Sequence, residues 1–236
     1  MSGQAATEAG TGAVTSRHAA VSGQSVAVVR YYVVLLARSQ RWLPPVLFYA
    51  IALAIDTAGG DSRADAFAYY AAFLLPVSAW LTRAILTTEP PEAAAITATV
   101  VGPARARLAS LTAATGYGLL CAVVGGLIGV ARGSSGHASA VLAGLCTELI
   151  CVLLGTAAGA LAAPPLVPAT GWGVLLAGLL ALGLLVARPS PAAMGIRALT
   201  EAGNGTALHF PLAALPLALI VTAAAWAAAT VATTRR

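Results

Sequence analysis

Apolar residues fill most of the chain and occur in long runs, while polar residues are confined to the connections between them. A helix needs roughly 20 apolar residues to cross the hydrocarbon core of a bilayer, which is about 30 Å thick. We therefore expect an all-α polytopic membrane protein with about six membrane-spanning helices. The predicted spans are Trp42 to Ala58, Phe67 to Leu86, Leu108 to Val130, Ala138 to Leu161, Gly171 to Ala187 and Leu212 to Ala232.

A shorter apolar segment, Val26 to Ala37, precedes the first span and is interrupted by Arg30. It is too short and too charged to cross a bilayer. One interpretation is an amphipathic helix in the plane of the lipid headgroups, with its arginines toward phosphates and its aliphatic side chains, including Leu36, toward acyl chains. The other interpretation is a cytoplasmic extension of the first span. The pattern itself does not favour either.

Two of the polar connections are long enough to hold a short helix of their own. The first, Thr87 to Arg107, begins with Pro90 and Pro91, continues with alanine-rich sequence and reaches Gly102-Pro103. Proline at the start and glycine at the end are typical of a short helix, here one outside the membrane. The second connection, Arg188 to Phe210, predicts another short helix between Ser190 and Gly203.

Composition and charge support the membrane assignment and predict an orientation. Hydrophobic residues make up 59% of the chain and charged residues 9%, against roughly 25% charged in a soluble domain. All 13 basic residues are arginines, and they do not gather with aromatic residues, so we expect no nucleic-acid partner. More arginines fall on the side of the chain ends, which predicts cytoplasmic termini in a multi-pass plasma-membrane protein. Residues 1–25 are predicted to be a disordered cytoplasmic tail, and 26–236 the membrane domain.

Glu148 is the one ionisable residue near the middle of a predicted span. Ionisable groups at that depth are costly, and they usually face a cavity or a neighbouring helix. We expect this carboxyl group to be protonated, or hydrogen-bonded to a hydroxyl group such as that of Thr112, Thr115 or Tyr117. A functional role and a structural interhelical hydrogen bond both fit the sequence.

Motifs for catalysis or for cofactor binding are weak or absent. Without a lysine the chain has no GxxxxGK[ST] phosphate loop, so any ATPase must be another chain. Cys146, Glu148 and Cys151 do not form a complete metal site, and we expect neither a metal nor a cofactor. Gly133-Ser134-Ser135-Gly136, with His209 as a possible base, matches the GxSG string of rhomboid intramembrane proteases, but the same four residues are typical of a turn.

The order of these segments resembles that of export-type ABC-transporter permease subunits (type V, drug or polysaccharide exporter-like). RYYVVLLARSQRWLPP is similar to the elbow helix of that family, and TTEPPEAAAITATVVGPARAR to its cytoplasmic coupling helix. RPSPAAMGIRALTEAGNGT lies where the family has short re-entrant helices on the outer side. The resemblance covers roughly residues 26–236.

The resemblance implies a non-catalytic permease that pairs with a second permease subunit, identical or related, and with separate ATP-binding cassette subunits. It implies export of an apolar or amphipathic compound. ATP hydrolysis in the partner would act on the membrane helices through the connection after the second span. The residues expected to couple the ATPase to the permease are Glu89, Glu92, Ile96, Val100 and Arg105.

Two further hypotheses belong to other functional classes. A secondary transporter usually has internal repeats and several ionisable groups in its spans, whereas this sequence shows one such carboxylate and no clear repeat. A membrane scaffold or immunity protein needs only the hydrophobic helices. A neighbouring gene that encodes a phosphate-loop protein would favour the permease over the scaffold.

Overall fold

The structure, a computed structural model, describes residues 24–59, 63–131, 138–168, 170–204 and 213–235, and these form helices and connections without a strand. The all-α prediction is confirmed for this part of the chain. Most of the predicted tail and the candidate protease residues Ser134, Ser135 and His209 lie outside it. After a helix of residues 24–39 come α2 (Leu43–Gly59), α3 (Arg63–Leu86), α4 (Pro91–Val101), α5 (Pro103–Ala131), α6 (Ala138–Leu161), α7 (Thr170–Val186), α8 (Pro191–Gly203) and α9 (Ala214–Thr234).

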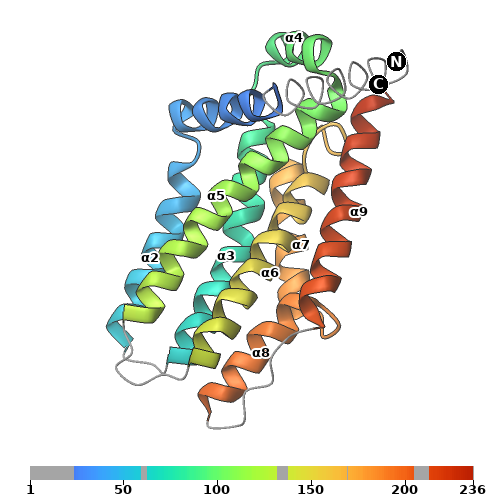
Figure 1. Cartoon of the computed structure of the whole chain (residues 1–236). Helices are drawn as coiled ribbons and strands as arrows, with labels where there is room; N and C mark the ends of the chain where they lie inside the picture. The colour runs from blue at the N-terminus through green and yellow to red at the C-terminus, as the bar shows by residue number, and fades with distance from the viewer. Residues whose placement is uncertain (1–23, 60–62, 132–137, 169, 205–212, 236) are drawn as a thin grey trace, which may run out of the picture.

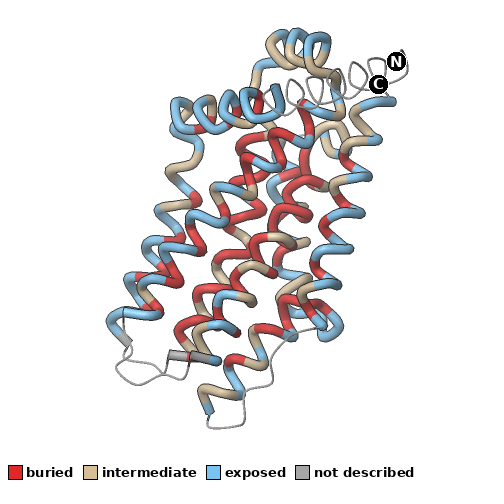
Figure 2. The backbone as a smooth tube through the Cα atoms, in the orientation of Figure 1, coloured by how far each residue is buried: buried red, intermediate tan, exposed pale blue. Residues whose placement is uncertain are grey.

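Helices α3 and α6 form the centre of the bundle, where buried residues concentrate (Figure 2). They run in the same direction and approach closely because glycines of α6 face the backbone of α3 (Figure 1). A Cβ atom at Gly155 would lie 2.5 Å from the Leu75 carbonyl oxygen, and one at Gly159 would collide with that of Ala79. Small residues at helix contacts are typical of membrane bundles, in which packing replaces the hydrophobic effect as the driving force.

The number of membrane crossings is supported only in part. By length and composition, four helices can cross a bilayer, namely α3, α5, α6 and α9, or five if α7 and α8, bent by 49°, are one broken span. Helix α2 has 17 residues, so it rises about 25 Å and falls short of a hydrocarbon core of about 30 Å. The count of six spans therefore remains a prediction, since it requires both α2 and the bent pair α7 and α8 to cross.

The helix of residues 24–39 lies across one end of the bundle (Figure 1). The chain turns at Gln40, which has a φ of 56°, so this helix is not an extension of α2. Val28, Tyr32 and Leu36 are four residues apart and pack against the ends of α3 and α5. Leu36 is fully buried there, so the expectation that it faces acyl chains is wrong.

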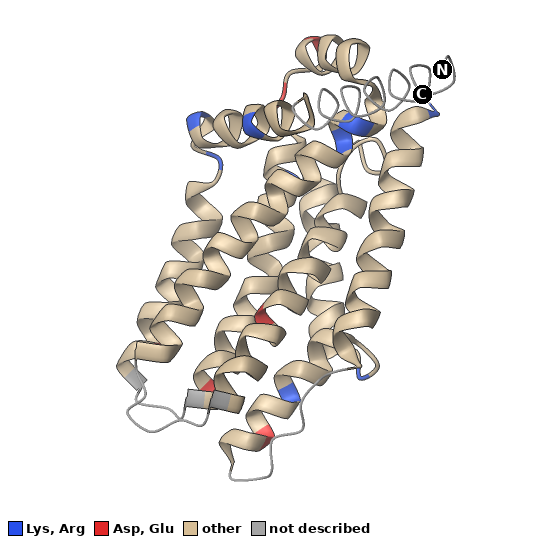
Figure 3. Cartoon of the chain, in the orientation of Figure 1, with Lys and Arg blue, Asp and Glu red and all other residues tan. Residues whose placement is uncertain are grey.

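Both ends of the described chain, the helix of residues 24–39 and the end of α9, lie at the same end of the bundle (Figure 1). Charged residues lie mostly toward the two ends of the bundle, and most of the described arginines lie at this terminal end (Figure 3). The opposite end carries α8, the short helix predicted after Ser190, which packs against α3 and α6. The chain therefore has a strongly basic end, and the positive-inside rule predicts that this end is cytoplasmic.

Candidate functional site

Helix α4 lies at the terminal end and carries exposed apolar side chains, which border an open groove beside the helix of residues 24–39. It begins at Pro91 and ends before Gly102, whose φ of 90° lets the chain turn into α5. None of its residues is buried. Glu92, Ile96 and Val100 are spaced four residues apart and are all exposed, Ile96 to 67% and Val100 to 68%. Residues at this spacing share one face of a helix, and we call these three the outer stripe.

The carboxylate of Glu89, one of the residues expected to couple the ATPase, accepts hydrogen bonds from other parts of the chain. Oε1 accepts hydrogen bonds from the Tyr31 hydroxyl at 3.1 Å and from the Thr97 hydroxyl at 2.8 Å, and Oε2 accepts one from the Tyr32 hydroxyl at 2.9 Å. Glu89, two residues before the start of α4, thus joins the helix of residues 24–39 to α4 itself. Glu89 is a positioning residue rather than part of the exposed surface.

The environment of Tyr32 stabilises the hydrogen bond that its hydroxyl group donates to Glu89. Burial raises the pKa of Tyr32 above its ordinary value, and the hydrogen bond to Glu89 adds to that shift. The hydroxyl therefore keeps its proton at neutral pH and remains a donor. A hydrogen bond to a charged group is worth about 1.5–3 kcal/mol. Nearby, the Arg41 Nη1 atom donates to the Thr87 carbonyl oxygen at 2.8 Å and ties the start of α2 to the same connection.

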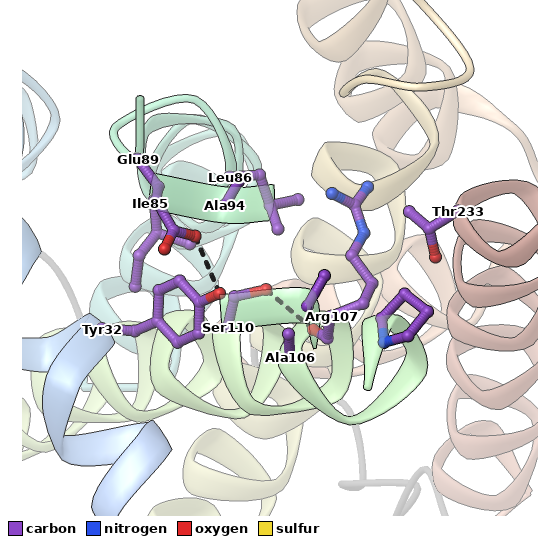
Figure 4. A pocket seen from close by; sticks show the side chains of 11 residues that line it. Tyr32, Ile85, Leu86, Glu89, Ala94, Ala106, Arg107, Ser110 and Thr233 are labelled. Carbon is purple, nitrogen blue, oxygen red and sulfur yellow. Dashed lines mark hydrogen bonds between the residues drawn. The ribbon is translucent and has the colours of Figure 1, made fainter. Parts of the chain in front are cut away.

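A pocket of about 250 Å³ lies between α4 and the bundle, bordered by Tyr32, Glu89 and the ends of α3, α5 and α9 (Figure 4). Arg107 lines it and is only 8% exposed. Its Nε and Nη2 atoms have no hydrogen-bond partner among the described residues. A buried guanidinium group without a partner is costly, so this position is where an anionic group from outside the described chain would be stabilising.

Arg105, two residues before Arg107, has the opposite environment. Its side chain is exposed and lines a separate groove together with Arg30. Two residues along a helix are about 200° apart around its axis, which places the two arginines on opposite sides of α5. Counting flanking charges in the sequence did not distinguish Arg105 from Arg107. If the sequence analysis had predicted that α5 begins at Pro103, helical geometry would have placed Arg105 and Arg107 on opposite sides of this helix.

Glu148 is fully buried in α6, as its sequence position predicted, but its neighbours differ from the prediction. The hydroxyl groups of Thr112, Thr115 and Tyr117 donate instead to backbone oxygens, those of Leu108, Leu111 and Val33 respectively. The expectation that these hydroxyls bind the Glu148 carboxyl group is therefore wrong.

The groups next to the Glu148 carboxyl come from α2 and α5. A Cβ atom at Gly125 would collide with the Tyr49 hydroxyl and lie 3.2 Å from Glu148 Oε1, and one at Gly126 would lie 3.4 Å from Oε2. Both carboxyl oxygens and the Tyr49 hydroxyl are buried without a hydrogen-bond partner among the described residues. The glycines of α5 thus make room for a polar pair in the middle of the bundle.

The described residues offer little else for chemistry. They include no group of three or more histidine, cysteine or acidic side chains that could hold a metal ion. Cys121, Cys146 and Cys151 are free thiols within α5 and α6. Comparisons with models of known protein families, with curated proteins and with solved structures find no match. The functional argument therefore depends on α4 and on its connections to the bundle.

Proposed function

We propose that the chain is the membrane-spanning permease subunit of an ABC exporter in the plasma membrane. It would move an apolar or amphipathic compound with ATP hydrolysed by a separate subunit, and it would pair with a second permease subunit. The observation that carries this proposal is the outer stripe of α4. An exposed ridge of Ile96 and Val100 on a helix at the basic end is the kind of surface that a groove on a partner protein accepts.

The connections of α4 are those that mechanical coupling requires. Glu89 ties its start to the helix of residues 24–39, and Gly102 leads directly from its end into α5. The preceding helix, α3, is at the centre of the bundle. A displacement of α4 by a bound ATPase would therefore reach α3 and α5 through short, ordered connections, and α5 carries the glycines that lie next to the Glu148 carboxyl group.

The scaffold hypothesis does not account for two features of the terminal end. A scaffold that lies only in lipid gains nothing from an apolar ridge on a helix beyond the bundle, since exposed apolar patches usually mark interaction sites. It also leaves the Arg107 guanidinium group without a partner among the described residues. An assembly with a second chain supplies a function for the ridge and a source of anionic groups.

The test is co-purification with a candidate ATPase, chosen as a phosphate-loop protein encoded by a neighbouring gene of the source genome. The double variant Ile96→Asp, Val100→Asp places two charges on the outer stripe without touching a buried residue. We expect co-purification and ATP-driven transport to fall at least tenfold, because two charges are then desolvated in an apolar contact. A matched control, Ala187→Asp with Pro189→Asp, adds the same charge at exposed positions near the opposite end.

Normal insertion of both double variants is checked by their amounts in the membrane fraction. If the outer-stripe variant inserts normally and keeps full co-purification and transport, the ATPase does not dock on α4 and the proposal fails. If the control variant loses co-purification to the same extent, the effect of charge is not specific to α4.

A further inference from the structure

An open groove of about 690 Å³ runs between the helix of residues 24–39 and the first turns of α5. Its walls are apolar on both sides, and two exposed arginines, Arg30 and Arg105, line it. Neither arginine forms a salt bridge within the described residues. The apolar wall residues include Val26, Val29 and Val33 on the first helix and Leu108, Ala109 and Thr112, with its methyl group, on α5.

The location of the groove matches the boundary between lipid headgroups and acyl chains. Helix α5 has 29 residues and rises about 43 Å, more than the hydrocarbon core of about 30 Å, so its polar first turn lies in the headgroup region and its apolar span begins near Leu108. The helix of residues 24–39 lies across the end of the bundle at that level (Figure 1). Arg105 stands at the start of α5, and Leu108 and Thr112 follow it into the span.

The chemistry of the groove fits one class of ligand. A small anion would use the two guanidinium groups but leave the apolar walls uncovered, and a neutral lipid would use the walls but leave the charges unpaired. An anionic phospholipid uses both, because its headgroup carries a negative charge and its acyl chain is apolar. Basic residues near a membrane surface each contribute about 1 kcal/mol of attraction to anionic lipids.

We propose that this groove binds one anionic phospholipid, with its phosphate between Arg30 and Arg105 and an acyl chain along Leu108 and Thr112. The inference does not depend on the proposed ATPase partner. The bound lipid would add a third link between the first helix and α5, beside the packing of Leu36 and the hydrogen bond from the Tyr117 hydroxyl to the Val33 carbonyl oxygen. The lipid would thus help to hold the helix of residues 24–39 in place, and this helix is connected to α4 through Glu89.

The experiment measures lipid binding to the purified full-length chain in neutral detergent by native mass spectrometry. Phosphatidylglycerol is compared with phosphatidylcholine of the same acyl chains, and glycerol phosphate is added as a competitor without acyl chains. We expect one tightly bound phosphatidylglycerol, at least fivefold weaker phosphatidylcholine binding, and no displacement by glycerol phosphate. Equal binding of the two lipids, or displacement by glycerol phosphate at the concentration of the lipid, would overturn the proposal.

Variants separate this groove from general attraction to a basic surface. We expect Arg30→Gln and Arg105→Gln each to weaken phosphatidylglycerol binding roughly fivefold, the factor that corresponds to one arginine contact. Arg38→Gln is the charge control, because Arg38 is exposed on the same helix but does not line this groove. An equal loss in Arg38→Gln would show that net charge, and not the groove, binds the lipid.

A filling variant tests the acyl-chain contact without a change in charge. Thr112→Trp places a large side chain in the groove, and we expect it to weaken phosphatidylglycerol binding at least fivefold. Val123→Trp is the control, since Val123 is exposed on α5 about three turns further along. Unchanged binding in Thr112→Trp, or the same loss in Val123→Trp, would contradict the proposed position of the acyl chain.

Discussion

Glu148 and Arg107 are buried ionisable side chains. Among the described residues, the two carboxyl oxygens of Glu148 and the Nε and Nη2 atoms of Arg107 have no hydrogen-bond partner. Each unsatisfied buried polar group costs about 1–3 kcal/mol, and an uncompensated charge costs more. A buried polar side chain without a hydrogen-bond partner lowers the stability of the folded chain. A functional role therefore explains such a residue better than packing does. Glu148 lies among α2, α5 and α6, whereas Arg107 lies at the end of the bundle beneath α4.

The first prediction concerns Glu148. Leucine has a similar size and carries no polar atom, so Glu148→Leu should unfold at the same or a higher temperature than the parent chain, with a gain of about 1–3 kcal/mol. Transport by the assembled permease should fall at least tenfold in both Glu148→Leu and Glu148→Gln, because neither side chain can bind or release a proton. Thermal unfolding in detergent and transport into vesicles are the two measurements.

Glu201→Gln serves as the control for the Glu148 variants, because Glu201 is an exposed acid on α8. Glu201 has an interaction of its own, but an exposed carboxylate contributes only about 0–1 kcal/mol, so its removal should change unfolding little and leave transport unchanged. Full transport in both Glu148 variants would show that the carboxyl group has no function. A large loss of stability in Glu148→Leu would mean that the carboxyl group has a hydrogen-bond partner outside the described residues.

At this scale the sequence predicted the position of Glu148 but not its contacts. Its depth follows from counting residues along one helix, and burial follows from depth. The neighbouring hydroxyl, that of Tyr49, comes from α2, almost 100 residues earlier in the chain, and reaches α6 only because Gly125 and Gly126 leave space. Such a contact depends on how three helices pack, which a single sequence does not specify.

Elements were predicted more accurately than contacts. Helix α6 has the predicted bounds, and the short helices α4 and α8 occur where proline and glycine indicated them. Helix α5 is longer than expected, because it begins at Pro103 and includes Arg105 and Arg107, which the sequence placed in a polar connection. Hydropathy detects only the part of a helix that lies in lipid, so polar extensions of a span are missed.

The second prediction concerns the hydrogen bonds of Glu89, which connect α4 with the helix of residues 24–39. Glu89→Gln replaces a charged acceptor by a neutral one, which should weaken the hydrogen bonds from Tyr31 and Tyr32 by about 1 kcal/mol in total. We expect amide hydrogen exchange in residues 24–39 to become roughly fivefold faster, because that free energy holds the helix against the bundle. Exchange measured by mass spectrometry reports this directly.

Glu92→Gln is the matched control for Glu89→Gln, since it removes the same charge from an exposed position on α4. It should leave hydrogen exchange in residues 24–39 unchanged. The double variant Tyr31→Phe, Tyr32→Phe should accelerate exchange at least as much as Glu89→Gln, because it removes the two bonds that the amide only weakens. Identical exchange in Glu89→Gln and the parent chain would show that packing of Leu36 and Tyr32 alone holds the helix.

The whole molecule is polarised, with a basic end that carries α4 and an opposite end that carries α8 (Figure 3). Charge and hydropathy were sufficient to predict this polarity from the sequence. The number of crossings does not follow from charge and hydropathy, because α2 is short and α7 continues into α8 after a bend of 49°. Length alone cannot distinguish a short span from a helix that stops within the membrane, since bilayers thin and helices tilt.

The third prediction addresses the orientation and the crossings together. Single cysteines are introduced into a chain whose Cys121, Cys146 and Cys151 are replaced by alanine. Positions at the α8 end are Ala58, in the last turn of α2, and Asn204, directly after α8. Positions at the basic end are Thr99 on α4 and Leu166 between α6 and α7. All four residues are exposed in the structure.

Intact cells are then treated with a membrane-impermeant thiol reagent, with and without permeabilisation. If the basic end is cytoplasmic and all six segments cross, Ala58→Cys and Asn204→Cys react in intact cells, whereas Thr99→Cys and Leu166→Cys react only after permeabilisation. The reverse pattern would invert the orientation and remove α4 from the reach of a cytoplasmic ATPase. Protection of Ala58→Cys alone would show that α2 does not cross, and the same result for Asn204→Cys would show that α7 and α8 do not.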